Sequence, residues 1–370
     1  MFWRGPDALR SIVDACFAWA QEYQNENQSQ LRLRLDVKSR ALRFIVLGER
    51  HRPRGPLVRI GAWRGSRQPI AVFDPEQYQL LDFGAGRKLE RFGHEILDRP
   101  SPAAEGAAVA DPAAWRYATA RFDLVSGGTG EWDDAALSLP DGEQESWSVR
   151  HADSRLVMQL NTAGNVGLFP EQASNWDWIA EQVELSRQDV TTRAPRVLNL
   201  FAYTGGASLA AAAAGAEVTH VDASGPTVSA AKRNAEVSGL ADAPIRWLID
   251  DAIKFVAREC RRAKRYDGVI LDPPTYGKGP KGKPFKFAQH LTELMEHCGE
   301  LLEDDADSNR FLLFSCHAPG FGIDDARVTV ESVLPRGSSE GVVSRPLSLE
   351  STDGRTLKAG VSAHWSSTAS

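Results

Sequence analysis

Short apolar runs alternate with stretches of helical periodicity from about Arg196 onward. A short unbroken apolar run is typical of a strand that is buried on both faces. Five such runs occur, at 197–203, 217–221, 245–249, 268–271 and 310–315. Helical patterns separate them, at 207–214, 226–238, 252–263 and 285–302. This alternation predicts an α/β fold of the Rossmann-like type, a doubly wound parallel sheet with right-handed crossovers.

The last part of the chain predicts two more strands. Residues 343–349 and 360–365 are strand-like, and Thr352-Asp-Gly-Arg355 lies between them. An Asp-Gly pair between two strand-like runs is typical of a hairpin turn. We therefore expect a closing antiparallel hairpin, which brings the predicted sheet to seven strands.

The first half of the chain has a different pattern. Residues 77–185 contain short strand-like runs, such as 155–160, separated by turns rich in glycine, aspartate and proline. This spacing predicts a small β-rich domain that precedes the larger sheet. After Pro170 the apolar residues become periodic, which predicts a helix running to about Ser186.

Residues 1–76 are set apart by their charge. The chain carries a net charge of −6, yet this segment holds 13 Lys and Arg against 8 Asp and Glu, and the remainder holds 30 against 41. An amphipathic helix is predicted at about 7–24, followed by a basic block from Arg32 to Arg67. Such a block can contact nucleic-acid phosphates. Because aromatic residues are sparse in it, the favoured interpretation is a solvated, partly disordered extension. The predicted domains are 1–76, 77–185 and 186–370.

The overall composition limits the class of protein. A hydrophobic content of 42% and a charged content of 25% are ordinary for a soluble globular protein. No apolar run approaches the roughly 18 residues of a membrane helix. The first residues do not form the apolar core of a signal peptide, so a cytoplasmic protein is expected. Four widely spaced cysteines predict reduced thiols, with neither a disulfide framework nor a metal site.

A cofactor site is predicted where the first strand of the doubly wound sheet ends. Gly205 and Gly206 permit a tight turn into a helix, whose N-terminus favours a carboxylate. Asp222 ends the second strand, where a carboxylate can accept both hydroxyls of a ribose. These features also suit a nicotinamide dinucleotide. That ligand needs a third glycine for its pyrophosphate, however, and the next residues, Ala-Ser-Leu, provide none.

Acidic residues at the next two strand ends help to decide between a nicotinamide dinucleotide and another cofactor. Asp251 follows the third strand and suits an adenine amino group. Asp272-Pro273-Pro274 follows the fourth strand, where a dehydrogenase has no obvious use for it. The prolines fix φ and direct carbonyl oxygens into the cleft beside a reacting methyl group. Together these residues predict S-adenosylmethionine (SAM) as the cofactor and a methyltransferase as the enzyme.

The same segments resemble a known family. They are Leu198–Ser208, Val221–Ser224, Leu271–Gly282 and Ser315–His317, with further similarity at Leu80–Gly93 and Gly167–Ala173. They resemble the SAM-dependent methyltransferases related to the bacterial 23S rRNA large-subunit methyltransferase I group, which modify carbon 5 of cytosine. The resemblance covers residues from about 78 to 365. It implies a seven-stranded class I methyltransferase sheet and an RNA substrate.

The resemblance also implies roles for individual residues. Four residues of the first turn would surround the methionine moiety of SAM: Phe201, Tyr203, Thr204 and Gly205. Asp222 would bind the ribose and Asp251 the adenine side of the cofactor. Asp272 and Pro273 would face the reacting methyl group, and the segment Phe169–Gln172 would fold over the cofactor.

The sequence allows two kinds of atom to accept the methyl group, carbon 5 of a pyrimidine or the nitrogen of an amine. Carbon 5 of a pyrimidine needs a thiolate that adds to the base, and Cys316 at the end of the fifth strand is the candidate. The alternative is that Cys316 is a small buried residue, and Thr275 stands where some cytosine enzymes keep a cysteine. An amine acceptor instead needs a hydrogen-bond acceptor and a stacking surface, which Asp272 and Tyr276 could provide.

A basic loop follows the Asp-Pro-Pro sequence. Tyr276–Lys283 is rich in glycine and carries Lys278 and Lys281, which favours a lid or a clamp for nucleic-acid phosphates over an ordinary solvated loop. The leading hypothesis is therefore a methyltransferase that acts on RNA, with ribosomal RNA as the first candidate. A methyltransferase for protein or small-molecule amines is the second, and a non-catalytic SAM- or RNA-binding module is the third.

Overall fold

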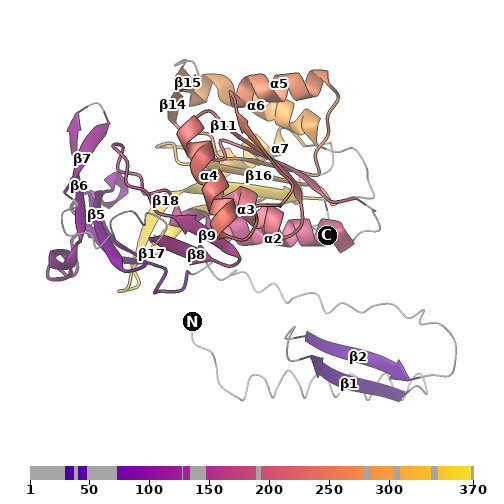
Figure 1. Cartoon of the computed structure of the whole chain (residues 1–370), viewed down its shortest axis with the longest axis horizontal. Helices are drawn as coiled ribbons and strands as arrows, with labels where there is room; N and C mark the ends of the chain where they lie inside the picture. The colour runs from indigo at the N-terminus through magenta and orange to yellow at the C-terminus, as the bar shows by residue number, and fades with distance from the viewer. Residues whose placement is uncertain are drawn as a thin grey trace. The chain divides into compact units, whose positions relative to one another are not determined.

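The chain forms two compact units, Met1–Gln68 and Pro69–Ser370 (Figure 1). The structure is a computed structural model that describes residues 30–36, 41–47, 73–126, 128–133, 147–188, 193–278, 284–302, 309–334 and 341–367. In the first unit, β1 (Gln30–Asp36) and β2 (Ala41–Leu47) pair antiparallel. The interpretation of this stretch as an extension missed the hairpin, although its basic residues alternate with apolar ones as in a strand. The helix predicted at 7–24 lies outside the described residues.

A seven-stranded sheet forms the centre of the second unit, in the order β12-β11-β10-β13-β16-β18-β17. Its strands are β10 (Arg196–Leu200), β11 (Glu217–Asp222), β12 (Ile245–Ile249), β13 (Gly268–Leu271), β16 (Phe311–Cys316), β17 (Val343–Glu350) and β18 (Thr356–Ser366). The first five are parallel, while β18 runs antiparallel to both β16 and β17. The predicted doubly wound sheet and its closing hairpin are confirmed.

Helices cover both faces of this sheet (Figure 1). One layer consists of α2 (Ala173–Gln188), α3 (Gly206–Ala213) and α4 (Gly225–Val237), and the other of α5 (Ala252–Arg261), α6 (Phe287–Leu301) and α7 (Ile323–Glu331). Ser224 begins α4 by accepting a hydrogen bond from the Thr227 amide at 3.3 Å. Among the described residues, no helix is both long and apolar enough to cross a membrane.

Successive residues of a central strand face opposite helix layers, because side chains alternate along a strand. In β16, Leu312, Phe314 and Cys316 belong to the apolar core that includes α5, α6 and α7. Phe311 and Leu313 pack instead with residues of α2 and α3. This alternation decides which side chains at the strand ends can reach a ligand.

The β-rich region that precedes the sheet consists of two smaller sheets. A five-stranded sheet contains β3 (Tyr78–Gly84), β4 (Arg87–Phe92), β5 (Glu95–Pro100), β6 (Ala120–Ser126) and β7 (Thr129–Asp133). A separate pair contains β8 (Ser148–His151) and β9 (Ser154–Val157). In addition, the region has the short helices η1 (Pro102–Ala104), η2 (Ala114–Tyr117) and η4 (Pro170–Gln172). The β8–β9 pair is joined to α4, since the Val157 amide donates to Asn234 Oδ1 at 2.9 Å.

A buried carboxylate ties the five-stranded sheet to the C-terminal hairpin. Asp82 in β3 is 1% exposed and accepts hydrogen bonds from Trp115 Nε1 at 2.8 Å and from the Asp111 amide at 3.0 Å. Arg355, in the turn between β17 and β18, donates to the same carboxylate. Burial alone raises the pKa of Asp82, but the hydrogen bonds from Trp115 and from backbone amides outweigh it and lower that pKa.

We expect Asp82→Ala to lower the free energy of unfolding by about 1–3 kcal/mol, because it leaves Trp115 Nε1 and the Ala110 and Asp111 amides without their acceptor. Urea denaturation measures this change. Since the pKa of Asp82 is lower in the folded state, the stability it contributes is present above the pKa of unfolded aspartate. It is lost as the pH falls through the folded value.

The control for this measurement is Asp123→Ala, whose side chain is 58% exposed and pairs with Arg121 on the surface. Exposed ion pairs contribute about 0–1 kcal/mol, so a small change is expected, which falls with pH in the same sense because Arg121 lowers the pKa of Asp123. Equal losses in the two variants would contradict a special role for the buried carboxylate.

Candidate functional site

The turn between β10 and α3 has an unusual backbone. Phe201, Tyr203 and Gly205 have φ values of +54°, +50° and +95°. A positive φ is uncommon in residues other than glycine and costs about 1–3 kcal/mol at each such position. The predicted strand 197–203 therefore ends at Leu200, since Phe201 already leaves the extended conformation. Strained backbone of this kind is concentrated at ligand sites.

Hydrogen bonds hold the strained turn in place. The Ala202 amide donates to the Val221 carbonyl at 3.1 Å, and the Tyr203 amide donates to Asp222 Oδ2 at 2.9 Å. Thr204 Oγ1 donates to the Gly167 carbonyl at 2.7 Å, which connects the turn to the segment that leads into η4. The end of β11 and the start of η4 thus fix the turn from two sides.

The Asp222 carboxylate lies directly behind this turn. Its second oxygen accepts a hydrogen bond from the Ser224 amide at 2.9 Å. Burial raises the pKa of Asp222, and the bonds from the Ser224 and Tyr203 amides oppose that rise. Each carboxylate oxygen keeps acceptor capacity beyond its one bond to the backbone. Asp222 can therefore both stabilise the turn and accept hydrogen bonds from a ligand hydroxyl.

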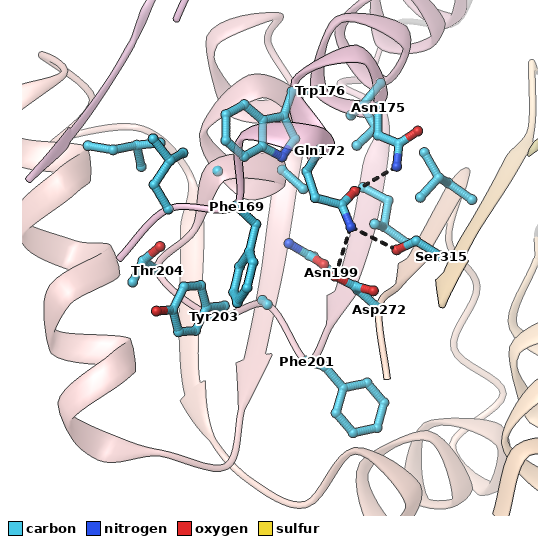
Figure 2. Close-up of a pocket in the computed structure, with 18 of the residues that line it drawn as sticks. Phe169, Gln172, Asn175, Trp176, Asn199, Phe201, Tyr203, Thr204, Asp272 and Ser315 are labelled. Atoms are coloured by element: carbon cyan, nitrogen blue, oxygen red, sulfur yellow. Dashed lines mark hydrogen bonds between the residues drawn. The ribbon is translucent and has the colours of Figure 1, made fainter. Parts of the chain in front are cut away.

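A pocket lies between this turn, the ends of the central strands and η4 (Figure 2). Residues that line it include Phe169, Gln172, Asn175, Trp176, Asn199, Phe201, Tyr203, Thr204, Asp272 and Ser315. The ring of Phe169 lies 5.1 Å from that of Tyr203 and 6.2 Å from that of His317, measured between centroids. The segment before α2 therefore forms one wall of the pocket, opposite the carboxyl ends of the strands.

The Asp272 carboxylate is the charged group in the wall formed by the strand ends. Gln172 Nε2 donates to its Oδ2 at 2.9 Å, and Oδ1 lies 3.5 Å from His317 Nε2 without a hydrogen bond among the described residues. Burial raises the pKa of Asp272, but His317, Ser315 and Gln172 outweigh it and lower that pKa. The carboxylate is therefore ionised at neutral pH.

His317 is the cation that balances this carboxylate. Burial alone lowers the pKa of His317, but Asp272 and then Glu171 outweigh it and raise the pKa to about 10. The Nδ1 atom of His317 lies 2.7 Å from the Ala359 carbonyl and 3.9 Å from Glu171 Oε1. At neutral pH the imidazole is thus protonated, and it serves as a donor and a counter-charge.

Cys316 lies on the other face of the sheet. Its side chain is 2% exposed within the core that includes α6 and α7, whereas Ser315 lines the pocket. Burial, and to a smaller extent Asp272, raises the pKa of the Cys316 thiol to about 11. The Ala318 amide donates to its sulfur at 3.3 Å. The structure therefore brings Ser315, and not Cys316, to the pocket wall.

The remaining predicted residues lie at different places around the pocket. Gly205 caps α3, and Pro273 is buried directly after Asp272. Asp251 caps α5 by accepting from the Lys254 amide at 3.1 Å, and it is not among the residues that line the pocket. Tyr276 and Lys278 lie in β14 (Tyr276–Lys278), which pairs with β15 (Pro284–Lys286). Lys281 lies outside the described residues.

Polar residues that the sequence analysis did not single out also line the pocket: Asn175, Asn199 and Ser315. Asn199 and Ser315 occupy positions in predicted buried strands, where a polar side chain needs a partner. These polar residues within apolar runs could therefore have been recognised as site candidates from the sequence. Gln172 was included only as the end of the segment expected to cover the cofactor, with no role of its own.

Trp176 explains why the second residue of the glycine pair is glycine. Its indole is 7% exposed and lies against the start of α3. A Cβ atom at Gly206 would come within 2.4 Å of Trp176 Cζ2. The close approach of α2 to the turn therefore depends on a residue without a side chain.

The chain is similar in sequence to known methyltransferases. A family model for S-adenosylmethionine-dependent methyltransferases matches residues 106–324. The chain is 26% identical over 181 residues to ribosomal RNA large subunit methyltransferase I of Aeromonas salmonicida, which covers 45% of this chain and 41% of that protein. It is 30% identical over 197 residues to ribosomal RNA large subunit methyltransferase K/L of Hahella chejuensis, covering 52% and 25%. The chain thus spans less than half the length of these relatives.

Among solved structures, a SAM-dependent methyltransferase from Agrobacterium tumefaciens is similar over most of its length. It is 33% identical to this chain, with a TM-score of 0.70, and the match covers 79% of this chain and 91% of that one. The similarity includes both the β-rich region and the seven-stranded sheet, because it extends well beyond the length of either alone.

We expect Gly206→Ala to lower the free energy of unfolding by about 1–3 kcal/mol, the usual range for an overpacked core. The added methyl group forces Trp176 or the start of α3 to move, and both line the pocket. Urea denaturation measures the loss, and calorimetric titration with SAM measures the accompanying loss of affinity. The control is Gly106→Ala, where a Cβ meets nothing within 4 Å. Similar losses in both variants would contradict the packing argument.

Proposed function

The chain belongs to the S-adenosylmethionine-dependent methyltransferase family, and we propose that it methylates a base of ribosomal RNA at an amino nitrogen. Membership in the family establishes the class of enzyme and its cofactor, SAM. The RNA substrate is proposed because the similar curated proteins are named as ribosomal RNA large subunit methyltransferases. The ionised Asp272 carboxylate in the pocket wall is the observation that supports the acceptor atom.

The residues of the pocket suit SAM as a ligand. SAM is cationic at its sulfonium, and Asp272 Oδ1 is a buried carboxylate oxygen without a hydrogen bond among the described residues. Phe201, Tyr203 and Thr204 line the same pocket beside the strained turn and would surround the methionine moiety. When bound, SAM supplies an electrophilic methyl group.

The other end of the cofactor would extend along the carboxyl ends of β11 and β12. Asp222 would accept hydrogen bonds from the ribose hydroxyls, since its oxygens keep acceptor capacity beside the bonds from backbone amides. Asp251 follows β12 and would lie on the adenine side, with its own carboxylate already capping α5. Gly205 would supply backbone at the start of α3, where anionic groups are favoured.

An amino nitrogen is favoured as the acceptor because the chemistry of a carbon-5 acceptor needs an accessible thiolate. Cys316 is the thiol nearest in sequence to the pocket, but it is 2% exposed, faces the core, and has a pKa raised to about 11. An amino group instead needs an acceptor for its N–H. Asp272 provides one, in the ionised form that accepts hydrogen bonds.

In this mechanism Asp272 orients the amino group and stabilises the positive charge that forms on its nitrogen as the methyl–sulfur bond breaks, which would leave S-adenosylhomocysteine. The charged nitrogen would then lose its proton to water. Its lowered pKa makes it a hydrogen-bond acceptor and a counter-charge more than a strong base. Pro273, buried after Asp272, fixes the backbone at that point. Phe169, 36% exposed beside Tyr203, is available for stacking against a base.

The position of the RNA is proposed from the elements around the pocket. β14 begins only a few residues after Asp272, so Tyr276, Lys278 and Lys281 would meet the nucleotides that flank the target base. The β-rich domain, residues 77–185, contributes η4 and would help to position the substrate. Lysine contacts of this kind bind phosphate without reading sequence.

Transfer of tritium from labelled SAM tests the substrate class. We expect the purified full chain to label total RNA, with the label in large-subunit ribosomal RNA, and to leave total protein unlabelled. RNA already methylated at the target would not accept label, so RNA transcribed in vitro is the matched substrate. Label found only in protein would contradict the RNA proposal and favour the amine methyltransferase hypothesis.

Two variants test the acceptor atom. We expect Asp272→Asn to lower kcat by about 100-fold, since it removes the charge that stabilises the reacting nitrogen. Cys316→Ala should retain turnover within a few-fold, because its thiol packs in the core. Mass spectrometry of the nucleosides should show an N-methylated base. A 5-methylcytidine product together with an inactive Cys316→Ala would show that the acceptor is carbon 5.

A further inference from the structure

Four side chains from distant parts of the sequence form a continuous hydrogen-bonded chain that ends on Asp272. Arg345 Nη2 of β17 donates to Asn175 Oδ1 of α2 at 3.1 Å. Asn175 Nδ2 donates to Gln172 Oε1 at 2.6 Å, and Gln172 Nε2 donates to Asp272 Oδ2 at 2.9 Å. Figure 2 shows the last two links beside the pocket.

The direction of this chain is fixed from both ends. A guanidinium group has only donors, so the atom of Asn175 that faces Arg345 has to be its carbonyl oxygen. The amide nitrogen of Asn175 then faces Gln172 and requires the oxygen of that residue. The amide nitrogen of Gln172 is left to face the ionised carboxylate, which has only acceptors. Arginine and aspartate thus select one orientation for each of the two amides.

Burial makes any other arrangement costly. Asn175 is 1% exposed and Gln172 is 7% exposed, so water does not substitute for a missing partner. If one amide turned over, two oxygens or two N–H groups would face each other in the interior. The second N–H of Gln172 is also within reach of an acceptor, since Nε2 lies 3.2 Å from Ser315 Oγ.

We propose that Gln172 and Asn175 are positioning residues for methyl transfer, which hold the Asp272 carboxylate in one orientation toward the acceptor, with Arg345 setting the direction of the chain. This inference rests on the proposed role of Asp272. A bond from Gln172 to Oδ2 opposes rotation of the carboxylate and keeps that oxygen supplied with a donor. The remaining acceptor positions of Asp272 then face the acceptor in a constant geometry.

Charged and titratable groups face this hydrogen-bonded chain at both ends, and at the Arg345 end they include Asp177 of α2, whose charge opposes the lowering of the Arg345 pKa by burial. His317, after β16, faces Asp272 Oδ1 at 3.5 Å, and its Nε2 lies 3.2 Å from Gln172 Nε2, so these two nitrogens approach the two oxygens of one carboxylate side by side. Glu171 of η4 lies on the far side of His317 at 3.9 Å. At the other end, His364 Nε2 of β18 lies 3.1 Å from Asn175 Oδ1, and burial lowers its pKa to about 3, so it is neutral. Cys316 is neutral as well, because its pKa is raised.

The test uses Asn175→Asp in the full-length protein, a substitution that reverses the orientation of the Gln172 amide in the hydrogen-bonded chain. An aspartate still accepts from Arg345 but cannot donate to Gln172, so the Gln172 amide turns and presents its oxygen to Asp272. We expect the pKa of Asp272 to rise by about one pH unit, since it loses a donor and gains a facing oxygen. The titration is followed by the ¹³C chemical shift of labelled aspartate carboxyls, and Asp272→Asn identifies the resonance. The acid limb of the pH profile of kcat/KM for RNA should move up with it.

A second variant, Gln172→Met, separates two effects of Asn175→Asp: the turning of the Gln172 amide and the electrostatic effect of the added carboxylate. In Gln172→Met the donor is lost, and the pKa of Asp272 rises without any new charge. Adding Asn175→Asp to this background should then produce no further rise. A rise that persists there would show that the new carboxylate acts through space, and it would overturn the positioning role. If Asn175→Asp alone does not fold, the rise in Gln172→Met tests the final link, and its absence overturns the proposal.

The titration needs no RNA, so its failure is distinct from failure of the proposed function. An unchanged pKa of Asp272 in both single variants would overturn the inference even if the enzyme methylates RNA. Absence of RNA labelling by the wild-type chain would instead overturn the proposed function, whatever the titration shows.

Discussion

The negative charge of Asp272 is the constraint around which this pocket is organised. Its Oδ1 atom is buried, although the side chain as a whole is 32% exposed, and a buried carboxylate oxygen without a compensating charge would favour the neutral form. His317 supplies the counter-charge, and Gln172 supplies a hydrogen-bond donor. These partners come from the end of β16 and from η4. The closure of η4 over the strand ends is therefore part of what keeps the carboxylate ionised.

The alternation of side chains along β16 decides which chemistry the site can perform. Ser315 faces the pocket and Cys316 faces the core, although the two are adjacent in the sequence. A shift of one residue in this strand would exchange them and bring a thiol to the acceptor side. The register is fixed by pairing on both sides, since Phe314 pairs with Leu271 of β13 and with Ala363 of β18. Which of the two side chains lines the pocket thus follows from the packing of the whole sheet.

The sequence predicts the sheet well because its signal is local. The runs 245–249 and 268–271 coincide with β12 and β13, since short apolar segments between helices have few other structures available. The strained turn could not be predicted in the same way, because nothing in Phe201 or Tyr203 favours a positive φ. That conformation is imposed by hydrogen bonds that the turn donates to Val221, Asp222 and Gly167, which lie outside it. The contact of Gln172 could not be predicted from the sequence either, because its partner Asp272 is 100 residues away.

One short segment supports both sides of the pocket. The Gly167 carbonyl accepts from Thr204 in the cofactor turn, and Trp176 packs against Gly206 at the start of α3. Between them, Gln172 donates to Asp272 on the opposite wall. Because these contacts all belong to residues 167–176, the cofactor side and the acceptor side cannot move independently. The strain in the turn and the orientation of the carboxylate are thus maintained by the same piece of backbone. The β-rich region reaches the pocket through this segment, so a domain outside the sheet would bear on the proposed chemistry at its edge.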